Sequence, residues 1–377
     1  MADLFFEPSK HLTLGVEIEL QLIDPNNFNL YPKALEILKL CNNAEKIKPE
    51  LFQSMLEINT GICNNVHEVK EDIKQTTNLL YNICKQIGVE CATTGTHPFA
   101  RYVERKLFPS ERYRNSIDRN QWIARRLSIF GLHVHIGMKS GEECIKFMNL
   151  FQKFLPHLIT ISASSPFWQA KDTGLSSSRL SIFEASPTSG HCQWMYDWND
   201  LSEQVNALIN CGAIKSTKDL WWDLRPSPDF GTLEIRVCDG IATLNELLAI
   251  VAFIHTLAHW YENLSNAQRK DLGLLEYIPL WLIRENKWRA MRYGFEMDLI
   301  KNNSGETIPI RKDFINIINQ LNEVSEKLGY QEYFTYLFTI LKHGNSATRQ
   351  KKYFNKHKSF KKVAEFNVKE FKQSFIG

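Results

Sequence analysis

The sequence has 377 residues, of which 44% are hydrophobic and 23% are charged, and its formal net charge is +3. This composition is typical of a globular protein with a sizeable core, and a nearly balanced charge does not by itself indicate a nucleic-acid or membrane partner. No stretch approaches the roughly 18 uninterrupted apolar residues of a membrane span, and the amino-terminal residues lack the pattern of a signal peptide. The eight cysteines form no C-x-x-C pair. We therefore expect a cytoplasmic protein with reduced thiols.

The predicted elements mix strands and helices along the whole chain, whose length allows one large domain or two smaller ones. Alternation of apolar and polar residues predicts strands at 13–23, 53–59, 131–138 and 231–238. Helical periodicity predicts helices at about 66–87, 142–161, 243–264, 311–328 and 361–374, two of which end at Gly88 and Gly329. Residues 166–200 are expected to form a long ordered loop, a kind of segment that often carries function. This irregular order favours a mixed α/β sheet protein over a doubly wound parallel fold.

The first predicted strand, "TLGVEIELQLID" at 13–24, carries two glutamates on one face. Residues two apart in a strand point to the same side, so Glu17 and Glu19 stand next to each other. Two neighbouring carboxylates repel each other unless a positive group lies over them. This face is therefore either solvated or bound to a cation.

Three further strands repeat the pattern of a polar pair that faces away from apolar residues. The pairs are Glu57 and Asn59 in "SMLEINTG" (54–61), His133 and His135 in "GLHVHIGM" (131–138), and Glu234 and Arg236 in "TLEIRVCD" (232–239). One such strand alone is typical of a solvated face, but four in one chain favour a site for divalent metal ions. Carboxylates with imidazoles suit Mg²⁺ or Mn²⁺, whereas zinc would more often recruit thiolates.

Two other features have simpler interpretations. His255 and His259 in "HTLAH" have the spacing of a helical zinc pair, but the sequence lacks the glutamate of H-E-x-x-H and the helix is very apolar. We interpret both as packed histidines. The basic stretch from Arg349 to Lys372 is typical of a solvated helix face, and its aromatic residues are expected to anchor it to the body. We therefore expect no nucleic-acid partner.

The sequence has no glycine-rich phosphate loop and no dinucleotide fingerprint, so metal ions and arginines would have to hold a nucleotide. Guanidinium groups suit this task because they bind phosphate and carboxylate through paired hydrogen bonds. The candidates are Arg225 and Arg236 in "WWDLRPSPDFGTLEIR", Arg284, Arg289 and Arg292 in "RENKWRAMRYG", and Arg349 with Asn345 in "HGNSATRQ". For any one of these arginines the alternative is an ordinary surface ion pair.

Five segments in this order resemble the carboxylate–amine ligases of the glutamate–cysteine ligase type 2 family. They are "LGVEIELQLIDP", "GLHVHIGM", "WWDLRPSPDFGTLEIRVCD", "RENKWRAMRYG" and "GNSATRQ", and the resemblance covers about residues 12–352. It implies one α+β, glutamine-synthetase-like domain over residues 1–377, in which a curved, mostly antiparallel sheet has a polar concave active-site face and is backed by helices. Residues 353–377 would form a basic C-terminal tail. The resemblance also implies ATP and Mg²⁺ as cofactors, with Mn²⁺ as an alternative ion, and is compatible with a homodimer.

Carried over by motif, the resemblance assigns roles to individual residues. The implied metal ligands are Glu17, Glu19, Glu57, His133, His135 and Glu234. The implied catalytic arginines are Arg236, Arg225 and Arg179, the last of which lies in a substrate-covering loop at 174–190. The implied nucleotide contacts are Arg236, Asn345 and Arg349. The loop and the "GNSATRQ" segment depart from the family's usual pattern, which affects the identity of the substrates more than the ATP chemistry.

The activity that the resemblance implies is ATP-dependent amide formation through an acyl phosphate, with release of ADP and phosphate. Glutamate is the expected acid and cysteine a candidate amine. The alternatives are a ligase for another pair of acid and amine, a phosphotransferase that stops after the first step, and a non-catalytic member that binds a partner or nucleic acid through its basic tail. The intact Glu and His positions argue against the last of these. No membrane partner is expected.

Overall fold

The computed structural model describes residues 4–42 and 44–376. Its centre is an open, seven-stranded sheet in which neighbouring strands are antiparallel. The strand order is β10–β11–β5–β1–β3–β2, and β4 pairs with the second half of β1. The strands are β1 (Leu14–Ile23), β2 (Ile47–Pro49), β3 (Met55–Asn59), β4 (Glu90–Ala92), β5 (Gly131–Gly137), β10 (Leu224–Ser227) and β11 (Thr232–Asp239). The predicted α+β class with a mostly antiparallel sheet is confirmed.

The register of the sheet brings the polar pairs of the predicted strands together around β1. Glu17 of β1 lies opposite His133 of β5 on one side and opposite Asn59 of β3 on the other. Glu19, two residues later, lies opposite Glu57 of β3. Because residues two apart in a strand share a face, these side chains all belong to one side of the sheet.

Strands β10 and β11 extend the same polar face. Glu234 of β11 lies opposite His135 of β5 and, on its other side, opposite Arg225 of β10. A β-bulge follows at residues 235–238, where the pairing of β11 with β5 shifts its register. Bulges often re-aim a side chain beside an active site, and this one contains Arg236.

The opposite face of the sheet is apolar and forms the main core. Val16, Ile18, Val134 and Ile235 are at most 1% exposed, and burying each such side chain stabilises the fold by about 1.5–3 kcal/mol. The helices that cover this face are α2 (Val66–Gln86), α5 (Gly141–Gln152), α6 (Leu155–Ser162) and α9 (Leu244–Asn263). Side-chain caps start several of them, such as Thr243 at α9, whose hydroxyl accepts a hydrogen bond from the backbone N–H of Glu246.

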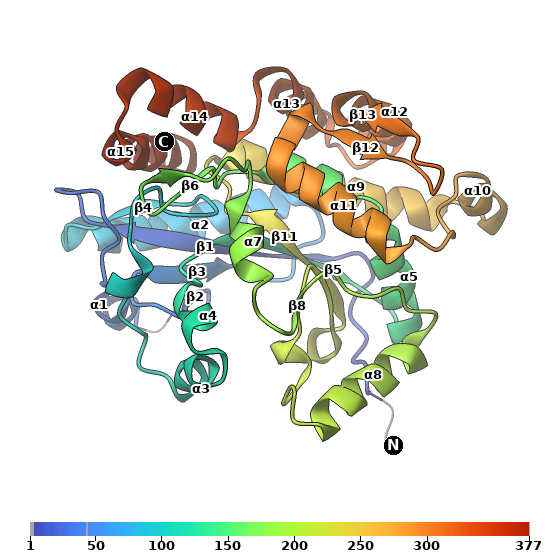
Figure 1. The fold of residues 1–377 in the computed structure, drawn as a ribbon, viewed down its shortest axis with the longest axis horizontal. Coiled ribbons are helices and arrows are strands. Elements are labelled where there is room, and N and C mark those ends of the chain that lie inside the picture. The colour runs from blue at the N-terminus through green and yellow to red at the C-terminus, as the bar shows by residue number, and fades with distance from the viewer. Residues whose placement is uncertain (1–3, 43, 377) are drawn as a thin grey trace.

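The remaining helices lie around this two-layer centre (Figure 1). The carboxy-terminal ones gather along one side of the molecule, above the sheet in this view: α11 (Leu280–Tyr293), α12 (Ile310–Lys327), α13 (Gln331–His343), α14 (Ser346–His357) and α15 (Phe360–Phe371). The others are α1 (Ala34–Leu40), α3 (Glu111–Asn120), α4 (Trp122–Arg125), α7 (Ser178–Phe183), α8 (Trp198–Asn210) and α10 (Asn266–Asp271). Short two-stranded pairs complete the fold: β6 (Phe167–Trp168) with β7 (Lys171–Asp172), β8 (Ser189–Gly190) with β9 (Trp221–Trp222), and β12 (Asp298–Ile300) with β13 (Thr307–Pro309).

Several sequence predictions are confirmed and two are corrected. Gly88 and Gly329 follow α2 and α12 with φ of +66° and +74°, a left-handed conformation that glycine adopts at little cost. The helix predicted at 142–161 is two helices, because the chain turns between α5 and α6 and Pro156 lies in the first turn of α6. The long loop predicted at 166–200 contains β6, β7, α7, β8 and the start of α8.

The basic carboxy-terminal segment is helical and packed against the body. Phe354 of α14 and Phe360 of α15 stack on each other, and both contact Phe167. Further along, Phe371 and Phe375 are each 2% exposed and belong to the main core. The prediction that aromatic residues anchor this segment is confirmed. These aromatic side chains pack against the protein, so they are not free to stack on nucleic-acid bases.

We predict that Phe371→Ala lowers the free energy of unfolding by about 3 kcal/mol, since a phenylalanine removed from a packed core leaves a cavity. Chemical denaturation of the purified protein measures the change. Phe338→Ala is the control, because Phe338 of α13 is 41% exposed and its loss should change stability by less than about 1 kcal/mol. Equal effects of the two variants would show that the carboxy-terminal helix is not part of the core.

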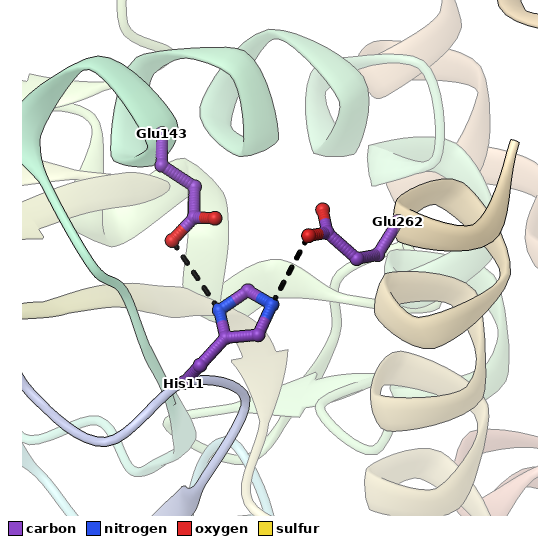
Figure 2. Close-up of side chains that lie close together, drawn as sticks. All are labelled: His11, Glu143 and Glu262. Atoms are coloured by element: carbon purple, nitrogen blue, oxygen red, sulfur yellow. Dashed lines mark ion pairs between the residues drawn. The ribbon is translucent and has the colours of Figure 1, made fainter. Parts of the chain in front are cut away.

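The segment before β1 is held against α5 and α9 by a histidine that lies between two glutamates (Figure 2). The Nδ1 atom of His11 lies 3.3 Å from Oε2 of Glu143 in α5, and its Nε2 atom lies 3.4 Å from Oε1 of Glu262 in α9. The Lys139 ammonium lies 3.9 Å from Glu143 and 3.4 Å from Glu262. This cluster joins the segment before β1 to two core helices. Among the described residues, no helix is long and apolar enough to span a membrane.

Candidate active site

The centre of the polar face is Glu17, which lies between two histidines of the neighbouring strand. Its Oε2 atom is 3.1 Å from Nδ1 of His133, and its Oε1 atom is 3.4 Å from Nε2 of His135. Burial raises the pKa of Glu17, but the contacts with the neighbouring His133 and His135 outweigh this and hold it well below its usual value. Glu17 is therefore an ionised carboxylate, as a metal ligand must be.

Glu234 is fully buried and lies between two arginines. Arg225 donates from Nε to Oε2 of Glu234 at 2.7 Å, and Arg236 contacts the other carboxylate oxygen. Burial raises the pKa of Glu234, but the charges of Arg236 and then Arg225 lower it far below its usual value. Oε1 of Glu234 also lies 3.9 Å from both His133 and His135, so this carboxylate joins the arginines to the histidines.

A second group of carboxylates lies on the β2–β3 side of Glu17. Glu19 accepts a hydrogen bond from the backbone N–H of Gly131 at 2.5 Å, and Glu57 accepts one from Asn59 at 2.9 Å. Burial raises the pKa of Glu57 well above its usual value, and the negative charges of Glu17 and Glu50 raise it further. In the absence of a cation, the neighbouring negative charges therefore disfavour the ionised form of Glu57.

Glu50 belongs to this cluster and was missed in the sequence. Glu19, Glu50 and Glu57 each place a carboxylate oxygen within 4.8 Å of the others. Glu50 directly follows β2, outside any alternating pattern, so the only sequence signal was an acidic residue shortly before the Glu57 strand. Burial, followed by the charge of Glu19, raises the pKa of Glu50 to about 7.

The residues of the polar face fit divalent metal ions. Two groups that share Glu17 each place one ligand atom per residue within 4.8 Å of one another: Glu17, His135 and Glu234, and Glu17, Glu57 and His133. The Nε2 atoms of His133 and His135 are buried and make no hydrogen bond among the described residues. A cation would supply a partner for these nitrogens and would relieve the repulsion among the carboxylates. All six sequence-predicted metal ligands therefore lie together on this face.

The predicted catalytic arginines also lie at the polar face. Arg225 and Arg236 contact Glu234, as described above, and Arg236 has its Nε atom buried without a hydrogen-bond partner in the described chain. Arg179 of α7 is 2% exposed and donates from both terminal nitrogens to the carbonyl oxygen of Arg236 at 3.3 Å. It passes so close to Gly131 that a Cβ there would lie 2.3 Å from its guanidinium. Arg179 thus fixes the backbone beneath Arg236.

The two other predicted nucleotide contacts, Asn345 and Arg349, have partners elsewhere. Asn345 caps α14 by accepting from the backbone N–H of Thr348 and donates to the carbonyl of Thr160. Arg349 forms a two-pronged contact with Glu246, at 2.5 and 2.8 Å, and a third bond with Glu370. No contact among the described residues joins either side chain to the polar face, and their role in nucleotide binding stays a prediction.

The helical histidine pair is not a metal site. His255 is 1% exposed, and its two ring nitrogens contact the Tyr330 hydroxyl at 2.9 Å and the Leu12 carbonyl at 2.8 Å. Burial, and then the neighbouring His259, lowers the pKa of His255 to about 3. Both nitrogens already have partners within the core, which confirms the interpretation of a packed histidine.

The raised pKa of Glu50 gives a prediction about stability. Its carboxyl ionises near pH 4.5 in the unfolded chain but only near pH 7 in the folded protein. Between these values the folded state keeps a proton that the unfolded state has released, so the stability of the metal-free protein should fall by up to about 3 kcal/mol as the pH rises. Glu50→Gln should remove this loss. Urea unfolding with a chelator at pH 5 and pH 8 measures it.

The control for that experiment is Glu45→Gln, because Glu45 is an exposed acid on the same segment. We expect Glu50→Gln to be more stable than the wild type at pH 8 and equal to it at pH 5, whereas Glu45→Gln should match the wild type at both. Adding Mg²⁺ at pH 8 should narrow the difference between the wild type and Glu50→Gln. A pH-independent effect of Glu50→Gln would contradict the prediction.

The family model described as "Glutamate-cysteine ligase family 2 (GCS2)" matches residues 13–365. The chain belongs to this family. It is an ATP-dependent carboxylate–amine ligase whose substrates are a small-molecule acid and a small-molecule amine. The family resemblance read from the motifs is thereby confirmed, and the matching region extends past residue 352.

Curated relatives of this ligase family cover nearly the full length. A protein of Bdellovibrio bacteriovorus is 45% identical over 330 residues, which are 87% of this chain and 86% of that protein. A protein of Gloeobacter violaceus is 40% identical over 358 residues, 94% and 95% of the two chains. Both carry the name "Putative glutamate–cysteine ligase 2".

Solved structures of ligases share the fold at low sequence identity. The glutamate–cysteine ligase of Francisella tularensis, determined in complex with AMP, has a TM-score of 0.70 at 12% identity, covering 97% of this chain and 90% of that one. A bifunctional glutathione synthetase from Pasteurella multocida has a TM-score of 0.65 at 12% identity, covering 96% of this chain and 52% of that one. These structures confirm the predicted glutamine-synthetase-like fold.

Proposed function

We propose that this ligase activates the side-chain carboxylate of glutamate with ATP and joins it to an amine, for which cysteine is one candidate. The observation that carries the proposal is the combination of a carboxylate–imidazole cluster and a pair of arginines around Glu234 on one face. Carboxylate and triphosphate are both anions, so positive charge must be supplied where they meet. The names of the relatives support this choice of substrates.

The residues proposed to hold Mg²⁺, or Mn²⁺ in its place, are those whose oxygen and nitrogen atoms converge on the polar face: Glu17, Glu19, Glu57, His133, His135 and Glu234. When bound, such ions neutralise charge on the phosphates. Glu50 is added to this set from the structure, because its carboxylate lies with those of Glu19 and Glu57. Binding of cations here would also lower the raised pKa values of Glu50 and Glu57.

Arg236 is proposed to contact the transferred phosphoryl group. Burial lowers its pKa, but the adjacent Glu234 raises it above the usual value, so the guanidinium stays charged. Glu234 occupies one terminal nitrogen and leaves the rest of the fork for phosphate oxygens. Arg225 fixes Glu234 from its other side, and Arg179 fixes the backbone of Arg236. These two residues position the groups that contact the substrates.

The proposed reaction has two steps. In the first, an oxygen of the substrate carboxylate attacks the γ-phosphorus of ATP, the bond from this phosphorus to the β–γ bridging oxygen breaks, and ADP leaves. In the second, the uncharged amine attacks the acyl carbon, the bond from carbon to the phosphate oxygen breaks, and phosphate leaves as the nitrogen loses a proton. Phosphorylation is needed because an unactivated carboxylate has only oxide to expel. A positive arginine at the γ-phosphate favours attack there over attack at the α-phosphorus.

We predict that hydroxylamine intercepts the acyl phosphate. With ATP, Mg²⁺ and glutamate, the enzyme should form a hydroxamate and an equal amount of ADP, and no AMP. The ferric hydroxamate colour and nucleotide chromatography measure the two products. Without the carboxylic acid, little ADP should form from ATP, because a closed site excludes the water that would otherwise attack the phosphate.

Two results would contradict this proposal. Stoichiometric AMP would mean that the α-phosphorus is attacked. Rapid ADP formation that no acid from a broad panel stimulates would indicate an ATPase. A panel of other acids and amines in the same assay tests whether the ligase uses a different pair of substrates. The homodimer and the cytoplasmic location stay predictions.

A further inference from the structure

A cavity of about 460 Å³ lies beside the polar face, between the α7–β8 segment and helix α11. Its lining includes polar and charged side chains from both walls: Ser181, Glu184 and His191 from the first, and Arg284, Lys287 and Trp288 from α11. A cavity of this size that is lined by two basic side chains, one carboxylate and one imidazole indicates a site for a small polar molecule.

The base of the cavity is a buried ion triad. Lys287 is 2% exposed, and its ammonium contacts both the partly exposed carboxylate of Glu184 and the fully buried carboxylate of Asp223. Burial lowers the pKa of Lys287, but Asp223 and Glu184 raise it above its usual value, so the ammonium stays charged. One oxygen of Asp223, Oδ1, is buried and has no hydrogen-bond partner in the described chain. The triad therefore carries more negative than positive charge and leaves an acceptor unused.

Arg284 presents a positive charge to the cavity, and His191 presents a neutral imidazole. The Nε–H of Arg284 donates to Nε2 of His191 at 3.1 Å, which places the proton of the neutral imidazole on Nδ1. This Nδ1 is buried and has no acceptor among the described residues. The terminal nitrogens of Arg284 remain available, because the side chain is exposed and only its Nε is engaged. The cavity thus offers unused donors close to unused acceptors, since His191 lies on the same wall as Glu184 and Arg284 lies on α11.

Hydrogen bonds connect the segments around the cavity to Arg236 at the polar face. Asp223 lies one residue before β10, and its carbonyl oxygen accepts a hydrogen bond at 2.8 Å from the backbone N–H of Arg236. Glu184 directly follows α7, the helix whose Arg179 binds the carbonyl of Arg236. Both carboxylates of the triad are therefore attached to segments that hold Arg236.

We propose that this cavity binds the α-ammonium and α-carboxylate groups of the amino acid whose side-chain carboxylate is phosphorylated. Glu184 receives the ammonium group, with the buried charge of Asp223 close to it, and Arg284 with His191 receives the α-carboxylate. The inference rests on the proposed function and names the part of the chain that selects the acid substrate.

The chemistry of the second step decides between the two amino-acid substrates. An attacking amine must be uncharged, because an ammonium nitrogen has no lone pair. A pair of carboxylates stabilises the ammonium form and would oppose attack. The ammonium of the acid substrate does not react, so the same carboxylates can hold it throughout. The cavity therefore fits the acid substrate better than the amine.

Three acids of similar length separate the two halves of the site. They are glutamate, glutarate, which lacks the α-ammonium, and 4-aminobutyrate, which lacks the α-carboxylate. Arg284→Ala should raise KM for glutamate by about 10- to 100-fold, since a charge-assisted contact is lost, and should not change the rate with 4-aminobutyrate. Glu184→Gln should weaken the use of glutamate but not that of glutarate.

Arg289→Ala is the matched control. Arg289 lies on the same helix but pairs with Glu285 and the carbonyl of Asp298, outside the cavity, so it forms the surface ion pair that was the alternative to a nucleotide contact. It should leave KM for all three acids and for ATP within about twofold of the wild type. Glu184 and Arg284 are chosen over Lys287 because both are partly or fully exposed, so their variants should fold; melting temperatures check this.

Equilibrium binding separates this inference from the proposed function. Titration calorimetry with L-glutamate and a non-hydrolysable ATP analogue needs no turnover. Glutamate binding that Arg284→Ala weakens and Arg289→Ala does not would support the site even if no ligase reaction were found. Normal glutamate binding and KM in Arg284→Ala would overturn it, whatever the reaction. A raised KM for the amine alone would overturn it too, because the cavity would then belong to the other substrate.

Discussion

Replacing Glu17 with glutamine should lower kcat by at least about 100-fold while leaving the protein folded. The side chain is the centre of the polar face and lies within 3.4 Å of both His133 and His135. An amide keeps the shape of the carboxylate but removes the negative charge, so it is a poor ligand for Mg²⁺. The steady-state rate and the affinity for Mn²⁺, measured by titration calorimetry, should fall together.

The matched control is Glu90→Gln. Glu90 belongs to β4 in the same sheet but pairs with Lys372 at the edge, so its variant should keep normal activity and metal affinity. Glu17→Gln should not gain stability, because the ionised form of Glu17 has favourable partners in the two histidines. Glu57→Gln should gain stability in the metal-free protein, since its pKa is raised. Normal turnover of Glu17→Gln at modest Mg²⁺ would show that the metal assignment is wrong.

Arg236→Lys is expected to be nearly as inactive as Arg236→Ala, with kcat/KM reduced by about 100-fold or more in both. Arg236 must contact Glu234 and the phosphoryl group at the same time, which a planar fork with five donors can do. A lysine ammonium is a single point of charge on a flexible chain and cannot reach both. Assays of kcat and of KM for ATP, at saturating acid and amine, measure the loss.

Stability distinguishes a folding defect from a catalytic one in these variants. Arg236→Ala leaves the buried carboxylate of Glu234 with Arg225 alone, so we expect a loss of a few kcal/mol in the free energy of unfolding. Arg236→Lys keeps a positive charge and should lose less stability, although its activity stays low. Arg289→Lys serves as the control for the change of side chain. Near-normal rates of Arg236→Lys would reduce the role of Arg236 to general electrostatics.

Much of the polar face could be predicted from the sequence because a strand alternates with a period of two residues. This period alone places the two residues of a pair on one face, as for Glu17 with Glu19 and for His133 with His135. Which strands are neighbours depends on pairings between segments more than 100 residues apart, as between β1 and β5. Local periodicity holds no information on that pairing. The recurrence of polar pairs in four strands favoured a metal site, and the family resemblance added the sheet that joins them.

The residues that were missed are those whose role depends on contacts outside the strands. Glu50 comes directly after β2, where alternation has ended. Lys287 and Asp223 are 64 residues apart, and only the contact of α11 with the residue between β9 and β10 joins their charges. Arg349 had the sequence context of a phosphate ligand, but its guanidinium is engaged by Glu246 and Glu370, a contact between distant helices that no motif contains.

The cavity walls and the polar face come from different parts of the chain. The four strands provide the face, whereas a short loop and one helix provide the walls of the cavity. A larger side chain at Ser181 or Ser189, or a smaller one at Trp288, changes the room for a guest molecule without displacing any carboxylate on β1, β3, β5 or β11. If the cavity binds the acid substrate, related ligases can therefore change their acid specificity by substitutions at a few wall positions. The residues that carry out the phosphate chemistry can stay the same. A mutant library restricted to these wall positions is the natural starting point for redirecting this ligase to new acids.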